Sequence, residues 1–220
     1  MVRGMLRPLR ELQNYLRLPA AAKAERHLDS MGLPAQDPGI ERVIEEGVAW
    51  LGRAQDHSIS ADGGAARQYS LITGWGASYP ETTGYIIPTM LAYAELRRNV
   101  KIRQRAKQML DWLVSIQSPE GGFQGGTITA APAPPVTFNT GQILLGLASG
   151  VQAFGEYRQA MCRAADWLVQ TQDTDGCWRK YPTVTPPPAR RSMKLMWRRA
   201  YWRLHASSLK SLMPRRHWQT

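Results

Sequence analysis

Several absences narrow the class of this 220-residue chain before any motif is considered. Only two cysteines occur, Cys162 on an apolar helical stripe and Cys177 in a glycine turn, so we predict reduced, buried thiols and no cysteine-based metal site. No run of 18 apolar residues exists, so no membrane-spanning helix is expected. The basic segment 1–18 lacks the apolar core of a secretory signal. We predict that this segment forms an amphipathic helix docked on the rest of the protein. Because the secretory signal is missing, we predict a cytoplasmic location.

Acidic residues are absent from the C-terminal segment 189–220, which holds nine Lys and Arg and most of the net charge of +11. One interpretation is a basic arm that grips a nucleic acid or an anionic membrane. The codons offer another, because residues 193–202 read in a shifted frame give apolar helical text similar to residues 81–92. We favour the second interpretation. It predicts a disordered or out-of-frame tail on a truncated product, with no specific nucleic-acid partner.

One short sequence pattern occurs three times. Each copy has Trp-Leu, a Gln five residues after the Trp, and then an acidic residue followed by glycine; the copies start at Trp50, Trp112 and Trp167. Such recurrence indicates one supersecondary unit used repeatedly, here an amphipathic helix that ends in a glycine turn. We expect all three tryptophans to pack in the core. The acidic residues before glycine are expected to be turn residues: Asp62, Glu120 and Asp175.

A second, more apolar kind of segment alternates with these helices, over residues 82–94 and 139–148. A helix that is apolar on every side is surrounded by protein, whereas an amphipathic helix faces water. The pattern therefore predicts alternating inner and outer antiparallel helices. Pro88 requires a place in the first turns or a tolerated kink. Suitable N-cap chemistry lies at the start of the apolar segments: Thr82, Thr83, Asn139 and Thr140.

The glycine turns carry a resemblance to a known family. Segments 117–123 and 172–178 resemble the Gln…Gly-x-Trp/Phe repeats of the prenyltransferase and squalene-cyclase repeat superfamily, and segment 74–85 resembles bacterial toroid proteins that accompany exopolysaccharide genes. The resemblance implies an all-α fold, a partial α/α-toroid built as a ring of helical hairpins. A closed ring of six hairpins needs about twelve helices, more than this chain can supply. We therefore expect an incomplete ring that self-associates through its open edges.

Three segments follow from this organisation. Residues 1–36 are predicted to form an N-terminal amphipathic helix and linker, residues 37–188 the hairpin repeats, and residues 189–220 the basic tail. Loops 58–80 and 121–135 are longer than a connection needs, and each leads into an inner helix, so function is expected at the mouth where they meet.

The predicted catalytic residues are Glu81 and Tyr79. Glu81 lies beside a helix N-terminus, whose dipole is expected to keep the carboxyl ionised; a simple helix-capping role is the alternative. Residues that offer polar groups or flat rings at the same mouth are predicted to bind substrate: Trp75, Thr82, Tyr85, Phe138, Asn139 and Gln142.

Isoprenoid chemistry lacks its motifs in this sequence. The Asp-x-Asp-Asp acid of protonating cyclases is absent, no Asp-Asp pair is available for magnesium diphosphate, and no Asp, Cys and His trio suggests zinc. We expect no metal and no cofactor. The resemblance then implies an enzyme, or its remnant, that acts on or binds a saccharide or lipid-linked saccharide. The alternatives are a non-catalytic helical-repeat scaffold and a true isoprenoid-processing enzyme.

Overall fold

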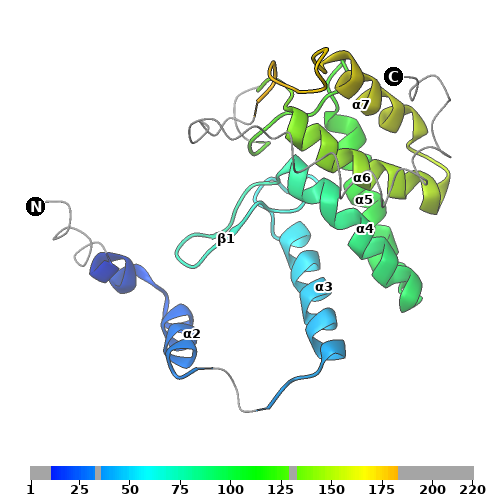
Figure 1. Cartoon of the computed structure of the whole chain (residues 1–220). Helices are drawn as coiled ribbons and strands as arrows, with labels where there is room; N and C mark the ends of the chain where they lie inside the picture. The colour runs from blue at the N-terminus through cyan, green and yellow to red at the C-terminus, as the bar shows by residue number, and fades with distance from the viewer. Residues whose placement is uncertain (1–10, 33–35, 129–132, 183–220) are drawn as a thin grey trace, which may run out of the picture.

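The computed structural model describes residues 11–32, 36–128 and 133–182, and this part of the chain is predominantly helical (Figure 1). After a helical stretch at 11–17, the helices are α2 (Ala20–Ser30), α3 (Ile40–Asp56), α4 (Pro80–Leu96), α5 (Val100–Ile116), α6 (Thr137–Phe154) and α7 (Arg158–Gln170). Two short antiparallel strands, β1 (Tyr69–Ser70) and β2 (Gly74–Trp75), pair between α3 and α4. The expectation of an all-α chain missed this small sheet.

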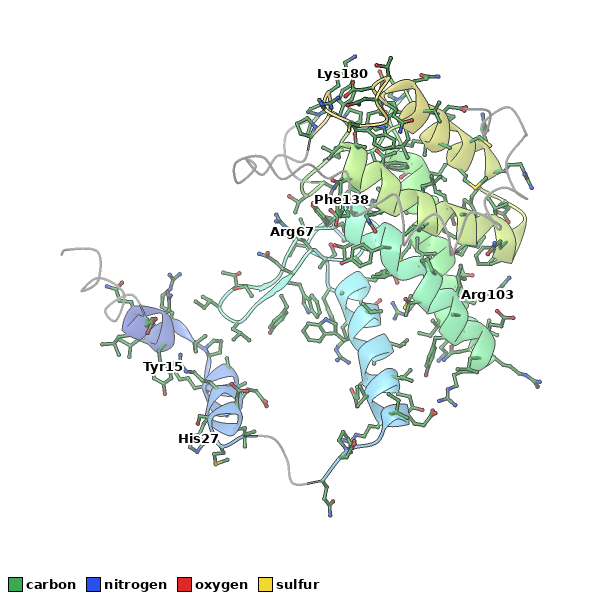
Figure 2. The ribbon with its side chains drawn as sticks, in the orientation of Figure 1. Tyr15, His27, Arg67, Arg103, Phe138 and Lys180 are labelled. Atoms are coloured by element: carbon green, nitrogen blue, oxygen red, sulfur yellow. The ribbon has the colours of Figure 1, made fainter. Side chains whose placement is uncertain are left out.

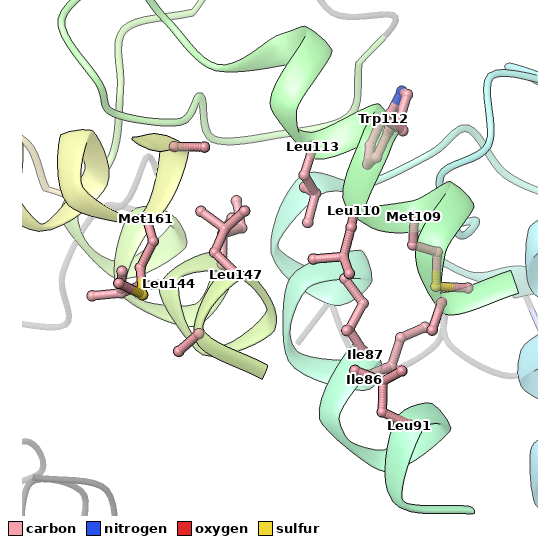
Figure 3. Packing of buried hydrophobic residues seen from close by; sticks show 14 of the residues in the cluster. Ile86, Ile87, Leu91, Met109, Leu110, Trp112, Leu113, Leu144, Leu147 and Met161 are labelled. Atoms are coloured by element: carbon pink, nitrogen blue, oxygen red, sulfur yellow. The ribbon is translucent and has the colours of Figure 1, made fainter. Parts of the chain in front are cut away.

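Helices α4 and α6 lie side by side at the centre of the packed helices. α4 also packs on α5, and α6 on α7. The apolar residues of these four helices fill one core, which Figure 3 shows from close by, and its fully buried members include Ile87, Met109, Leu113 and Leu147. α4 and α6 therefore occupy inner positions and α5 and α7 outer ones, in the order that the sequence pattern predicts.

The backbones of α4 and α6 touch at two glycines. A Cβ atom added at Gly84 would lie 2.6 Å from the Cα atom of Ile143, and one added at Gly146 would lie 2.5 Å from the carbonyl oxygen of Gly84. Real side chains do not approach backbone this closely. The two inner helices can therefore reach this separation only because both positions lack a side chain.

The repeated glutamine binds its own glycine turn in all three copies and ties the turn to the next outer helix in the first two. The Gln55 Nε2 atom donates to the carbonyl of its own turn at 3.0 Å and to the carbonyl of Arg105 on α5 at 3.2 Å. Gln117 does the same, donating to its own turn at 2.8 Å and to Ala160 on α7 at 2.9 Å. The third copy, Gln172, donates to its own turn at 3.1 Å. The glutamines are therefore structural, and the first two connect consecutive repeats.

The repeated tryptophan packs on the glycine turn of the repeat before it. A Cβ atom at Gly64 would lie 2.7 Å from the ring of Trp112, and one at Gly122 would lie 2.8 Å from the ring of Trp167. These two rings are 6% and 4% exposed. Trp50 is 44% exposed, so its predicted place in the core is wrong, because no copy of the repeated glutamine and glycine turn precedes α3 among the described residues.

The predicted N-cap role of Thr82, Thr83, Asn139 and Thr140 is also wrong. Both inner helices begin before them, at N-cap residues that make no side-chain capping bond. The Thr83 hydroxyl instead accepts the backbone N–H of Ala65 at 2.9 Å, and the Thr140 hydroxyl accepts that of Phe123 at 3.0 Å. Each threonine thus anchors the preceding glycine turn to an inner helix. Pro88 lies in the interior of α4, beyond its first turns.

Several other expectations concern the ends of the chain and the cysteines. Leu12 and Leu16 are exposed, so the described part of the N-terminal segment does not show the predicted docking. The predicted tail, 189–220, lies outside the described residues. Cys162 and Cys177 are free thiols, as expected, but half-buried rather than buried. Over residues 11–32, 36–128 and 133–182, none of the helices combines the length and apolarity that a membrane crossing needs.

Candidate functional site

The long loop before α4 is held in place by a buried chain of hydrogen bonds. Ser58 Oγ lies 2.7 Å from Ser78 Oγ, which donates to Asp62 Oδ1 at 2.6 Å. The same Asp62 oxygen accepts the N–H of Gly64 at 3.1 Å, so Asp62 is a turn residue as predicted. The N–H of Ile128 donates to the carbonyl of Ser78 at 3.0 Å. The two long loops therefore meet at the start of α4.

Three of the predicted site residues come together at this place. The Tyr79 side chain lies close enough to the Glu81 carboxyl to lower its pKa, and the Tyr79 hydroxyl accepts a hydrogen bond of 3.4 Å from Asn139 Nδ2. Tyr79 is the N-cap residue of α4, and Asn139 lies in the first turn of α6. The starts of two inner helices thus join a hydroxyl, a carboxyl and an amide, which we call the Tyr79 cluster.

Arg67 extends the Tyr79 cluster and was missed in the sequence. Its guanidinium carbon lies 5.2 Å from the centroid of the Tyr79 ring, and its positive charge lowers the pKa of Glu81. Figure 2 labels Arg67 and Phe138 at the end of the helices where α4 and α6 begin. Arg67 belongs to an irregular segment that has no periodic pattern. Its place in a loop leading to an inner helix was the one signal that could have indicated it.

The pKa of Glu81 is shifted in the direction opposite to the one expected. Glu81 is half-buried, and this burial raises its pKa, while the nearby Tyr79 side chain and the charge of Arg67 lower it by less. The carboxyl therefore keeps its proton to a higher pH than an ordinary glutamate does. The prediction that the helix dipole keeps Glu81 ionised did not take into account that burial removes water from the carboxyl.

Of the other predicted residues, four lie on helices α4 and α6, and Trp75 lies on strand β2. Tyr85 follows Glu81 by four residues on α4, and Gln142 follows Phe138 by four residues on α6, so each pair shares one helix face. Tyr85 is exposed, while Phe138, Gln142 and Thr82 are half-buried. These faces begin in the same first helical turns as the Tyr79 cluster.

Trp75 belongs to a different group of side chains. Its ring centroid lies 4.8 Å from that of Trp50 and 4.9 Å from that of Tyr69. These contacts engage Trp75 with α3 and strand β1, and none of them joins it to Tyr79. We therefore leave Trp75 out of the candidate site.

A shallow depression of about 570 Å³, whose lining includes no residue of the Tyr79 cluster, lies between the end of α3, the first glycine turn and α5. Asp56 on its rim pairs with Arg105 through two hydrogen bonds of 2.6 and 2.7 Å, and this arginine holds the pKa of Asp56 below its ordinary value. The rim is thus engaged in joining consecutive repeats. Across the described residues, no group of three or more His, Cys, Asp or Glu is placed to hold a metal ion.

No family model, curated protein or solved structure matches this chain. What the site can do therefore follows from its own residues.

Proposed function

We propose that this chain is a partial α/α-toroid of the prenyltransferase and squalene-cyclase repeat type, and that its Tyr79 cluster binds and processes a saccharide or lipid-linked saccharide. The observation that carries the proposal is the meeting of Tyr79, Glu81 and Asn139 at the starts of two inner helices, with Arg67 beside them.

Support for the toroid comes from the repetition of one interface. The same glutamine bond to the next outer helix and the same tryptophan-on-glycine contact occur twice in succession. An interface that repeats with the same geometry turns each unit relative to the last, and so builds a ring or a superhelix. The inner helices of such an arrangement present their N-terminal ends, and with them the Tyr79 cluster, at one mouth.

Support for a saccharide ligand comes from the chemistry of the cluster. A hydroxyl, a carboxyl and an amide are the groups that donate to and accept from sugar hydroxyls. Arg67 adds a fixed positive charge that suits a uronic acid carboxylate or a phosphate. Glu81, whose raised pKa brings its titration nearer to neutral pH, and Tyr79 form an acid and base pair for proton transfer on a sugar ring.

The single carboxyl in the Tyr79 cluster favours one reaction type over another. Glycoside hydrolysis requires two carboxyl groups at a set separation, and Glu81 is the one carboxyl in the described cluster. Removal of a proton beside a sugar carboxylate needs one base, one acid and a cation to neutralise the carboxylate. The residues present therefore favour lyase or epimerase chemistry on a uronic acid.

The test is calorimetric titration of the full chain with a uronic acid oligosaccharide, a neutral oligosaccharide and a polyprenyl phosphate. We expect the uronic acid ligand to bind, and Glu81→Ala and Tyr79→Phe each to weaken its binding about tenfold by removing one hydrogen-bonding group to a charged ligand. Glu120→Ala, which removes an exposed carboxyl in the second glycine turn, is the matched control and should change nothing. Binding of the polyprenyl phosphate alone would indicate isoprenoid chemistry, and no binding at all would favour a scaffold; either result overturns the proposal.

A further inference from the structure

The contact between consecutive repeats has a definite composition, and the chain uses it twice. The glycine turn of one repeat supplies a glutamine side-chain amide and a glycine on which a tryptophan ring packs. The next outer helix supplies a backbone carbonyl seven residues before its tryptophan, and the tryptophan ring itself. Each outer helix also donates from an arginine, but at different positions: Arg105, seven residues before Trp112, donates to Asp56, and Arg163, four residues before Trp167, donates at 2.6 Å to the carbonyl of Ser118.

The last glycine turn presents half of this contact. The Gln172 side chain is exposed, and its Nε2 atom donates to the carbonyl of Gly176 at 3.1 Å. An amide nitrogen has two hydrogens; in Gln55 and Gln117 the Nε2 atom also serves the next outer helix. No outer helix follows the third turn within the described residues.

Helix α3 presents the other half of the contact. It lies at the opposite end of the packed helices from α7 (Figure 1). Its Trp50 contacts Trp75 and Tyr69 on one side but stays 44% exposed, and Val43, seven residues before it, is exposed as well. Val43 and Trp50 thus occupy the positions from which α5 and α7 contribute the carbonyl and the tryptophan.

We propose that α3 of one copy of this chain docks on the third glycine turn of a second copy, and so repeats between chains the contact that is formed twice within the chain. The Val43 carbonyl accepts from Gln172 Nε2 of the second copy, and the Trp50 ring covers its glycine turn. The contact joins two different surfaces, so the association is head to tail. The argument rests on the repeated contact and is independent of the proposed saccharide site.

One residue leaves less room for a tryptophan ring on the third glycine turn than on the first two. Cys177 stands where the first two turns have Gly64 and Gly122. Because a Cβ atom at either glycine would lie within 2.8 Å of a tryptophan ring, the Cys177 side chain holds Trp50 further from the turn. The structure thus assigns a weak association that Cys177→Gly should strengthen, whereas most interface substitutions weaken binding.

The test is sedimentation equilibrium of the full chain over a range of concentrations. We expect the average mass to rise with concentration. Trp50→Ala should lower the association constant by about tenfold or more, which is the typical effect of truncating a tryptophan at the centre of an interface. Gln172→Ala should lower it by about fivefold, because one hydrogen bond is lost. Cys177→Gly should raise it by about fivefold, because it removes an overpacked side chain. Gln152→Ala, at an exposed position on α6, is the matched control.

Mixing two variants distinguishes a head-to-tail contact from a symmetric one. The Trp50→Ala chain keeps its third turn intact, and the Gln172→Ala chain keeps its α3 intact, so an equal mixture can form one native contact and should associate more strongly than either variant alone. A monomer at every concentration, a mixture no stronger than its components, or an equal loss in Gln152→Ala would overturn the proposal. Circular dichroism of each variant establishes that it is folded.

Discussion

Replacing Gly84 with alanine tests whether α4 and α6 pack by direct contact of their backbones. The new Cβ atom would lie 2.6 Å from the Cα atom of Ile143, whereas ordinary contact begins at 3.4 Å. A Cα atom cannot rotate away as a side chain can, so the two helices have to separate by just under 1 Å along their contact. Forcing a methyl group into such a site costs about 3 kcal/mol of unfolding free energy. In a protein of this size the melting temperature should then fall by roughly 6 to 12 °C.

Urea unfolding followed by far-ultraviolet circular dichroism measures this loss, and the chain offers a matched control. Gly47 is exposed in the middle of α3, and nothing lies within 4 Å of the position that its Cβ atom would take. Gly47→Ala should therefore stabilise the protein by up to about 1 kcal/mol through helix propensity alone. If Gly84→Ala were as stable as the unmodified chain, or if Gly47→Ala lost as much stability, the packing argument would be refuted.

Three further predictions concern the bonds that organise the repeats and the site. Gln117→Ala removes two hydrogen bonds that join consecutive repeats and should cost about 2 kcal/mol in urea unfolding, whereas Gln172→Ala, measured where the chain is monomeric, should cost clearly less. Thr140→Val leaves the buried N–H of Phe123 without its acceptor, so a similar loss of about 2 kcal/mol is expected in the same assay. Because the pKa of Glu81 is raised in the folded state, the folded protein binds this proton more tightly than the unfolded chain. The contribution of protonated Glu81 to the free energy of unfolding is present below the ordinary glutamate pKa and is lost as the pH rises through the raised pKa of the folded state. Glu81→Gln should remove that decline from a pH series of unfolding free energies, and an unchanged series would contradict it.

The order of inner and outer helices could be predicted from the sequence because hydrophobic periodicity reports burial directly. Segments that are apolar on every side became α4 and α6, and segments with one apolar stripe became α5 and α7. The glycine turns were also predictable, because a positive φ at Gly63, Gly121 and Gly176 is a local requirement of the backbone.

Contacts between distant segments could not be predicted in the same way. Trp50 matches Trp112 and Trp167 in its local sequence, yet its burial depends on a glycine turn that would have to come before α3. Thr83 and Thr140 looked like helix caps because their usual role is local, but their actual partners lie on preceding turns.

The candidate site was predicted only in part. Tyr79, Glu81 and Asn139 were expected at one mouth because they lie at the starts of inner helices, and the structure brings them together. Arg67 has no local signal of its role, and the raised pKa of Glu81 depends on how much neighbouring chain covers the carboxyl. Both depend on tertiary packing rather than on sequence spacing.

The titration of the Glu81 side-chain carboxyl, followed by carbon-13 NMR with and without a uronic acid oligosaccharide, tests the proposed function most directly. The free protein should show this carboxyl titrating above its ordinary value of 4.5, and bound saccharide should shift the titration because the ligand contacts the carboxyl. The carboxyl signal of the exposed Glu120, assigned in the same spectra, should not move when the ligand is added. A Glu81 carboxyl that titrates as an ordinary glutamate and does not respond to the saccharide would contradict the account.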